Sequence, residues 1–321
     1  MCVALDARKE RGEFKDADGD FVRATNSVTV TASGSVCVVT AGARALGPYG
    51  SPGQGMEKWL QSKLKLWNEL PEAERAPGAV TVPKLEIVDP KRAALAMPPG
   101  TLVVRVFNRH LGWDKDGALR YAVADDYVPG TGKADAERFA MAQNDFMWIP
   151  EQEWQALAPS EPKQGESRPA PASFALRLFR FHLDPARGFT EGANFTGSSA
   201  AAGRVTLTVQ DVTAEKVALK LEGHAELKQS GREEPQTYAP ALLGHLEYDR
   251  AKKTFIRFDL VALGSASGMP CDANGKVAFR KGAYPVGIAF ELVVSPTTAE
   301  RLYPRGARDN PAAYLEPREK R

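Results

Sequence analysis

The chain has 321 residues, 43% of them hydrophobic and 26% charged, as in an ordinary folded globular protein. This composition and a formal net charge of +2 exclude an intrinsically disordered chain. The charge balance also gives no field that would attract nucleic acid or an anionic membrane. Because no run of about 18 apolar residues occurs, we expect no transmembrane segment.

The N-terminus and the cysteines bear on the location of the protein. The first residues, "MCVALDARKERGEF", lack the apolar segment of a secretory signal peptide. A cytosolic protein and a protein exported by a signal upstream of residue 1 both fit this start. Cys2, Cys37 and Cys271 are far apart and form no C-x-x-C pair, which argues against a cysteine-rich zinc site. We interpret them as small buried residues; a Cys2–Cys37 disulfide would need an oxidising compartment.

The N-terminal half mixes strands with helices. "EFKDADGDFVRA" and "NSVTVTASGSVCVVTAG" each place strand-like flanks around turn residues, which is typical of hairpins. An amphipathic helix is predicted by apolar residues at helical spacing: Met56, Leu60, Leu64 and Trp67. Strands are predicted over 101–109 and 118–124, and a short helix over 133–143. In "MWIPEQEWQAL" a strand should run into a helix with Pro150 at its first turn.

A segment rich in proline, serine and charge, residues 159–173, predicts a linker. It would separate a mixed α+β region, 1–158, from an antiparallel β domain, 174–321. The candidate strands of that domain are 174–183, 203–212, 216–228, 239–249, 253–264 and 286–294. Several alternate between apolar and polar residues, which predicts a sheet with one buried and one polar face. We therefore expect a mainly β protein with a curled sheet, open barrel or sandwich in its C-terminal domain.

Two of the four histidines lie in neighbouring candidate strands. Alternation places His224, in "VALKLEGHAEL", and His245, in "LLGHLEYD", on the polar face, together with Asp259 of the following strand. His182, at the end of the first candidate strand, would join them if the sheet curls round. Imidazoles with a carboxylate suit zinc, copper or iron, so these four residues are a candidate metal site. The favoured interpretation is a solvated polar face, because Lys220 and Arg257 would repel a cation.

Nucleotide-binding and nucleophile motifs do not match. The glycine-rich loops 47–55 and 130–133 fit neither the Walker A motif nor G-x-G-x-x-G. "GSASG", residues 264–268, has Ala266 where a nucleophile elbow requires serine. The sequence therefore offers no catalytic signature.

Two stretches together resemble an uncharacterised family of exported bacterial proteins with a β-rich C-terminal half. They are "KLWNELPEAERAPGAVTVP" and, downstream, "LRLFRFHLDPARGF", "RVTLTVQDV", "LLGHLEYDRAKKTFIRFDLVALG" and "PVGIAFELV". The resemblance spans residues 55–295 and implies export and a shared fold, but it carries over no functional residues. The chain departs from the family after "VALG", where "SASGMPCDANGK" replaces a turn that bears glycine, histidine and tryptophan.

These observations favour an exported, non-catalytic binding or structural protein, with a ligand or protein partner that the sequence does not identify. The alternative is a metalloprotein, an oxidoreductase or a hydrolase, that binds copper, zinc or iron through His224, His245, Asp259 and His182.

Overall fold

The computed structural model describes residues 56–75, 97–127, 140–185, 200–229, 235–268, 282–297 and 311–317, with residues 38, 40, 46, 195, 300, 301, 304 and 307. The chain divides into two compact units, Met1–Ala96 and Met97–Arg321. The hairpins predicted in the first fifty residues, most of the helix predicted over 133–143 and the three cysteines lie outside the described residues.

The first unit contains the predicted amphipathic helix, α2 (Met56–Asn68), followed by the short helix α3 (Glu72–Arg75). Leu60 and Leu64, which should form its apolar face, are 46% and 58% exposed. Lys63 is buried instead, with its ammonium 5.1 Å from the centre of the Trp59 ring. The helix is confirmed, but the burial of its leucines is not.

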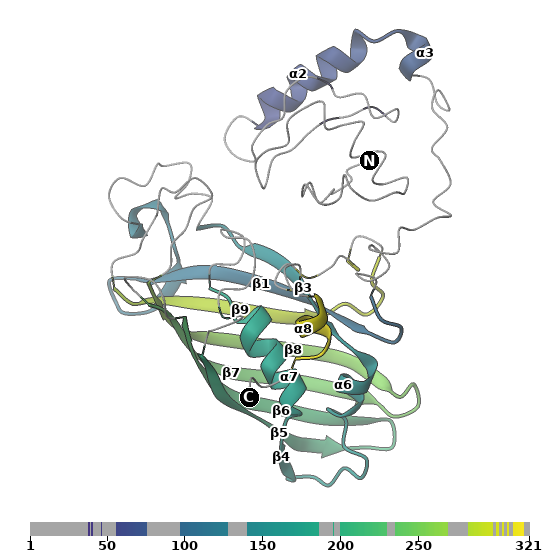
Figure 1. The fold of residues 1–321 in the computed structure, drawn as a ribbon, viewed down its shortest axis with the longest axis vertical. Coiled ribbons are helices and arrows are strands. Elements are labelled where there is room, and N and C mark those ends of the chain that lie inside the picture. Colours follow the sequence, from purple (N-terminus) through teal and green to yellow (C-terminus); the bar gives the residue numbers. More distant parts are fainter. Residues whose placement is uncertain are drawn as a thin grey trace. The chain divides into compact units, whose positions relative to one another are not determined.

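The second unit is built on one antiparallel sheet of nine strands that does not close into a barrel (Figure 1). The order of strands is β2-β1-β9-β8-β7-β6-β5-β4, and β3 also pairs with β1. The strands are β1 (Leu102–Trp113), β2 (Leu119–Tyr121), β3 (Gln143–Ile149), β4 (Ser167–Pro169), β5 (Ala200–Val212), β6 (Lys216–Gln229), β7 (Gln236–Asp249), β8 (Thr254–Ser267) and β9 (Tyr284–Leu292). The prediction of a mainly β protein with an open antiparallel sheet is confirmed.

Strands from both halves of the sequence share this sheet, so its extent differs from the predicted domain division. β1 pairs with β9, and the two compact units divide between Ala96 and Met97. The segment 159–173, predicted as a linker, contributes the edge strand β4, in which Ser167 lies opposite Thr208. Pro169 is compatible with this position because an edge strand has one side on which no N–H donor is needed.

The strand predicted over 174–183 is wrong. This segment forms helix α7 (Ala172–Arg177) and a π-helical turn, η3 (Leu178–His182). Its buried residues Phe174, Arg177, Leu178 and Phe181 follow the helical spacing i, i+3, i+4 and i+7. Alternation holds only over short stretches, first Phe174, Leu176 and Leu178 and then, shifted by one residue, Phe179, Phe181 and Leu183, and these stretches suggested a strand. Pro171 at the N-cap and the helix-forming residues Ala, Leu and Arg decide for the helix.

Helices cover one face of the sheet, called here the inner face. Figure 1 shows α7 lying across it, with α6 (Glu151–Gln155) and α8 (Pro311–Leu315) on the same side. The core joins Phe174 and Leu178 of the α7 region to apolar side chains of the strands, including Leu219, Leu246, Phe258 and Ile288. All are fully or almost fully buried, and burial of each such side chain stabilises the fold by about 1.5–3 kcal/mol.

A buried polar network attaches α8 to this core. Arg177 donates to both carboxylate oxygens of Glu153, at 2.8 and 3.0 Å, and also to backbone carbonyls at the end of α8. The hydroxyl of Tyr314 accepts the backbone N–H of Trp148 at 2.8 Å and lies 2.9 Å from Nε2 of His182. Burial raises the pKa of Tyr314, so the phenol keeps its proton. Tyr314 thereby provides a hydrogen-bond partner for a backbone group of Trp148 on the edge of β3 that no neighbouring strand pairs.

Candidate functional site

The two strand histidines both lie on the exposed outer face, as predicted, but the register separates them. His245 of β7 is opposite Lys220 of β6, and His224 is opposite Ala241. His224 therefore stands four residues along β6 from the partner of His245, or about 13 Å of strand. A shared metal ion would have to lie about 2.0–2.1 Å from a nitrogen of each ring, which this spacing opposes.

The other two predicted ligands do not complete the site. Asp259 is directly opposite His245, but its carboxylate accepts a hydrogen bond from Nε of Arg257 at 2.5 Å. His182 is fully buried on the inner side of the sheet, against Tyr314. Within the described part of the chain, no group of three or more His, Cys, Asp or Glu residues is placed to hold a metal ion. The structure brings His245 and Asp259 together and leaves His224 and His182 apart from them.

Part of the outer face is apolar instead of polar. Leu243, Val261 and Leu263, on β7 and β8, are 49%, 49% and 38% exposed. The register continues these positions into small or apolar residues of β9 and β1: Val261 faces Ala289, Leu263 faces Gly287, and Ala289 faces Phe107. These paired side chains form rows across the strands. We call the surface formed by these rows, together with the neighbouring side chains on the same face of β1 and β2, the outer patch.

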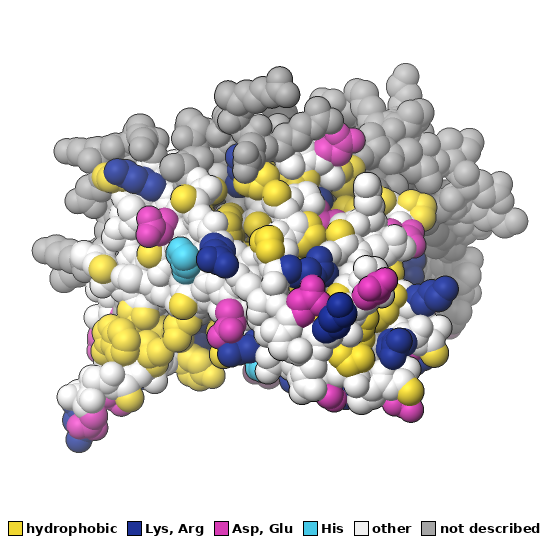
Figure 2. All heavy atoms as spheres, turned by 90° about the horizontal axis from the view of Figure 1, so that it is seen from below, with side chains coloured by type: hydrophobic (Ala, Val, Ile, Leu, Met, Phe, Trp, Pro, Cys, Tyr) yellow, Lys and Arg dark blue, Asp and Glu magenta, His cyan; other side chains and the backbone are white. Residues whose placement is uncertain are grey.

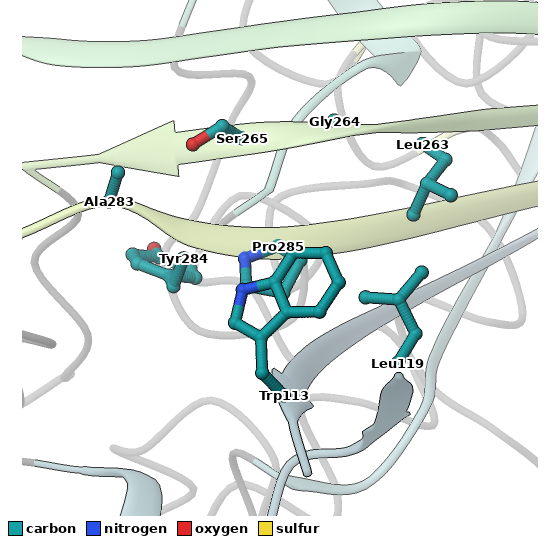
Figure 3. A pocket seen from close by; sticks show the side chains of 8 residues that line it. All are labelled: Trp113, Leu119, Leu263, Gly264, Ser265, Ala283, Tyr284 and Pro285. Carbon is teal, nitrogen blue, oxygen red and sulfur yellow. The ribbon is translucent and has the colours of Figure 1, made fainter. Parts of the chain in front are cut away.

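The outer patch ends in a shallow cavity of about 360 Å³, called here the Trp113 cavity. Figure 3 shows Trp113 and Leu119, from β1 and β2, facing side chains of β8 and β9. Its lining residues are Trp113, Leu119, Leu263, Gly264, Ser265, Ala283, Tyr284 and Pro285. Trp113 and Leu119 remain 57% and 41% exposed, so a bound molecule would cover apolar surface that now faces solvent.

Local sequence explains why these residues meet. The carboxylate of Asp114 accepts the backbone N–H groups of Asp116 and Ala118, at 2.9 and 2.8 Å, which forms the turn of the β1–β2 hairpin. The turn sets Trp113 directly opposite Leu119. Both side chains therefore project on the same face of the sheet.

Arg109 stands in the outer patch near this cavity. Its guanidinium carbon lies 3.7 Å from the centre of the Tyr121 ring, an arrangement typical of a cation–π contact. Nε of Arg109 is buried and has no hydrogen-bond partner within the ranges that the structure describes. Among the described residues, no carboxylate forms an ion pair with it.

Charged residues border the outer patch. One surface view shows acidic and basic side chains interspersed with hydrophobic ones (Figure 2). Across the sheet, Arg105 of β1 pairs with Glu291 of β9 at 3.5 Å and with Glu300. Glu300 accepts the backbone N–H and the hydroxyl of Thr297, both at 3.0 Å. These bonds, the N–H first, and the Arg105 contact lower the pKa of Glu300.

The residues of the cavity were not found from the sequence. Trp113 falls between the predicted strands 101–109 and 118–124 and was assigned no role, and Ser265 was considered only within the rejected "GSASG" motif. A signal was present: "LVALG" in β8 and "YPVGIAF" in β9 are nearly continuous apolar runs. Strands that are covered on both faces show such runs, whereas a solvated face produces alternation.

Comparisons with known protein families, with curated proteins and with solved structures found no match for this chain. None of the helices in the described residues combines the length and hydrophobicity needed to span a bilayer.

Proposed function

We propose that the protein is a non-catalytic binding protein that holds a small apolar ligand in the Trp113 cavity. The observation that carries the proposal is the cavity itself, walled by exposed Trp113 and Leu119 and continuous with the apolar outer patch. Its volume of about 360 Å³ falls within the ~300–1,000 Å³ of ligand sites, which are mostly apolar with a few polar groups. Ser265 supplies such a polar group.

The size of the outer patch favours a small ligand over a protein partner. The patch covers four rows of side chains, from the row of Phe107 to the row of Trp113, on at most five strands, or roughly 24 Å by 26 Å, since strands lie ~4.8 Å apart and rise ~3.3 Å per residue. The resulting ~620 Å² is an upper bound and is below the ~800 Å² that each partner contributes to a standard protein interface. It is nevertheless large enough to indicate a functional surface on a protein.

The chemistry of the lining supports binding over catalysis. Among the eight described residues of the cavity, none carries a carboxylate, imidazole, ammonium or guanidinium group. General acid–base catalysis at neutral pH most often uses such groups. The metalloprotein alternative lacks support, because His224, His245 and His182 are not brought to one point.

We propose export of the protein on the resemblance alone. Fractionation of bacterial cells that express the natural gene tests it, with a cytoplasmic enzyme and a periplasmic enzyme as markers. Recovery with the periplasmic or extracellular marker is expected, and recovery with the cytoplasmic marker alone contradicts the proposal.

The binding proposal is tested with a neutral aromatic probe, 1-anilinonaphthalene, whose fluorescence rises in apolar surroundings. Trp113→Ala removes one wall of the cavity, and Ser265→Leu fills it from an exposed position. We expect each variant to weaken binding about tenfold, equivalent to about 1.4 kcal/mol or to ~55 Å² of apolar contact.

The matched control for the filled cavity is Thr206→Leu, which adds the same side chain to the outer face of β5, outside the outer patch. It should bind the probe as the wild type does. Equal affinity of the wild type, Trp113→Ala and Ser265→Leu would overturn the proposal.

A further inference from the structure

We infer that the ligand of the Trp113 cavity carries one anionic group, such as a carboxylate or sulfonate, which binds to Arg109 while its apolar body occupies the cavity. This inference rests on the proposed function and adds the chemical class of the ligand to it.

The geometry brings the charge of Arg109 close to the cavity. Arg109 and Trp113 are four residues apart on β1 and project on the same face. The guanidinium lies over the ring of Tyr121, whose backbone is opposite Leu111, midway between Arg109 and Trp113 along β1. Leu119, which lines the cavity, is two residues from Tyr121, or about 7 Å of strand.

The charge of Arg109 has no counterpart in the described part of the chain. Two other arginines of the outer face do have one: Arg105 pairs with Glu291 at 3.5 Å, and Arg257 with Asp259 at 2.5 Å. Around Arg109 the register places Gly287 on β9 and Asn144 and Gln143 near it on β3, and none of these is acidic. A cation in an apolar patch, without a carboxylate, is complementary to an anion.

Arginine also suits this role better than lysine would. Its planar guanidinium offers two parallel N–H donors to a carboxylate or sulfonate while one of its faces stacks on an aromatic ring. Tyr121 provides that ring, so the side chain is already held in place before a ligand arrives. A preordered arginine loses less side-chain entropy on binding.

Elongated amphipathic monoanions match the two parts of the site. The apolar end would contact Trp113, Leu119 and Leu263, and the anionic end would lie at the Arg109–Tyr121 pair. A dianion or a fully polar molecule does not match, because the cavity lining offers it no second cation and few hydrogen-bonding groups.

The test compares two probes that differ by a single group: 1-anilinonaphthalene and its 8-sulfonate. Both are titrated into the full chain and into the variants Arg109→Gln and Trp113→Ala, with fluorescence as the readout. Arg109→Gln should weaken binding of the sulfonate about fivefold and change binding of the neutral probe by less than twofold. The difference should shrink as salt is added, because salt screens an exposed ion pair.

The outcomes separate this inference from the proposed function. Equal affinity of the wild type and Trp113→Ala for both probes overturns the proposed function, and the inference with it. If Trp113→Ala weakens both probes but Arg109→Gln leaves the sulfonate unaffected, the cavity stands and the anionic ligand is refuted. An equal loss of both probes in Arg109→Gln also refutes it, since Arg109 would then act only through packing on Tyr121.

Arg109→Lys provides a further check on the role of the two parallel N–H donors of the guanidinium. It keeps the positive charge but offers no parallel pair of donors. We expect an affinity for the sulfonate between those of the wild type and Arg109→Gln. Complete loss in Arg109→Lys, together with loss of the neutral probe, would contradict a direct contact with the anion.

Discussion

Glu153→Gln should destabilise the sheet unit strongly, because it removes the charge that compensates a buried arginine. Arg177 is 1% exposed and Glu153 is 6% exposed, and two hydrogen bonds of 2.8 and 3.0 Å join them. Breaking a buried ion pair by removing one partner costs about 3–5 kcal/mol, since the remaining charge stays desolvated. With an m-value of ~3 kcal/mol per M of urea, the unfolding midpoint should fall by at least about 1 M.

The assay is urea unfolding followed by tryptophan fluorescence, since buried Trp148 and Trp154 report on this part of the core. Asp259→Asn is the matched control, because it removes one carboxylate from an exposed pair with Arg257. Exposed pairs contribute little, so its midpoint should stay within error of the wild type. If Glu153→Gln and Asp259→Asn shift the midpoint equally, the reasoning from burial is refuted.

Three further changes test other parts of the fold. Tyr314→Phe should cost about 1–3 kcal/mol in urea unfolding, because a buried backbone N–H of β3 loses its acceptor; an unchanged midpoint would contradict this. The lowered pKa of Glu300, caused first by the Thr297 N–H, means that its stabilising contribution exists above about pH 4.5 and is lost as the pH falls through the lower native pKa. A carbon-13 titration that gives Glu300 a pKa of 4.5 or more would be inconsistent with the structure. Gly264→Ala should cost about 1–3 kcal/mol, because a Cβ there would lie 2.2 Å from a backbone carbonyl of β7. Gly287→Ala, whose nearest atom would be at 3.4 Å, should be tolerated, and equal unfolding midpoints for the two alanine variants would argue against such close strand packing.

Several features of the sheet followed from local chemistry. The candidate strands 239–249 and 253–264 left only a short connection between β7 and β8, and the carboxylate of Asp249 accepts the N–H groups of Ala251 and Lys252 there, as expected of a turn. Alternation placed His224 and His245 on the exposed face, which is confirmed. Both results depend on a few consecutive residues, so a single sequence was sufficient.

The register of the strands was not available from the same pattern. Alternation fixes the face of a residue but not its partner across the sheet, which depends on where the connecting segment turns. His224 and His245 therefore lie on the same face of the sheet but at different positions along their strands. As a result, the predicted metal ligands do not meet at one point. The helix over 172–182 was missed for another reason, since short stretches of alternation on either side of residues 178–179 were taken for a strand although the alternation shifts by one residue there.

The candidate cavity depends on contacts that no local pattern reveals. Trp113 meets Pro285 and Leu263 only because β1 pairs with β9 across most of the chain's length. The apolar runs in β8 and β9 indicated that both faces of these strands would be covered, but not which residues would line a cavity. Long-range pairing, and not residue type, determines the site.

Binding of a small apolar molecule in the Trp113 cavity can be observed directly by NMR. The most direct measurement is a set of intermolecular NOEs between 1-anilinonaphthalene and isotope-labelled protein. We expect NOEs from the aromatic protons of the probe to the indole of Trp113 and to the methyl groups of Leu119 and Leu263, and we expect these NOEs to be lost in Ser265→Leu. NOEs to other side chains that persist in Ser265→Leu, or the absence of any NOE at saturating probe, would contradict it.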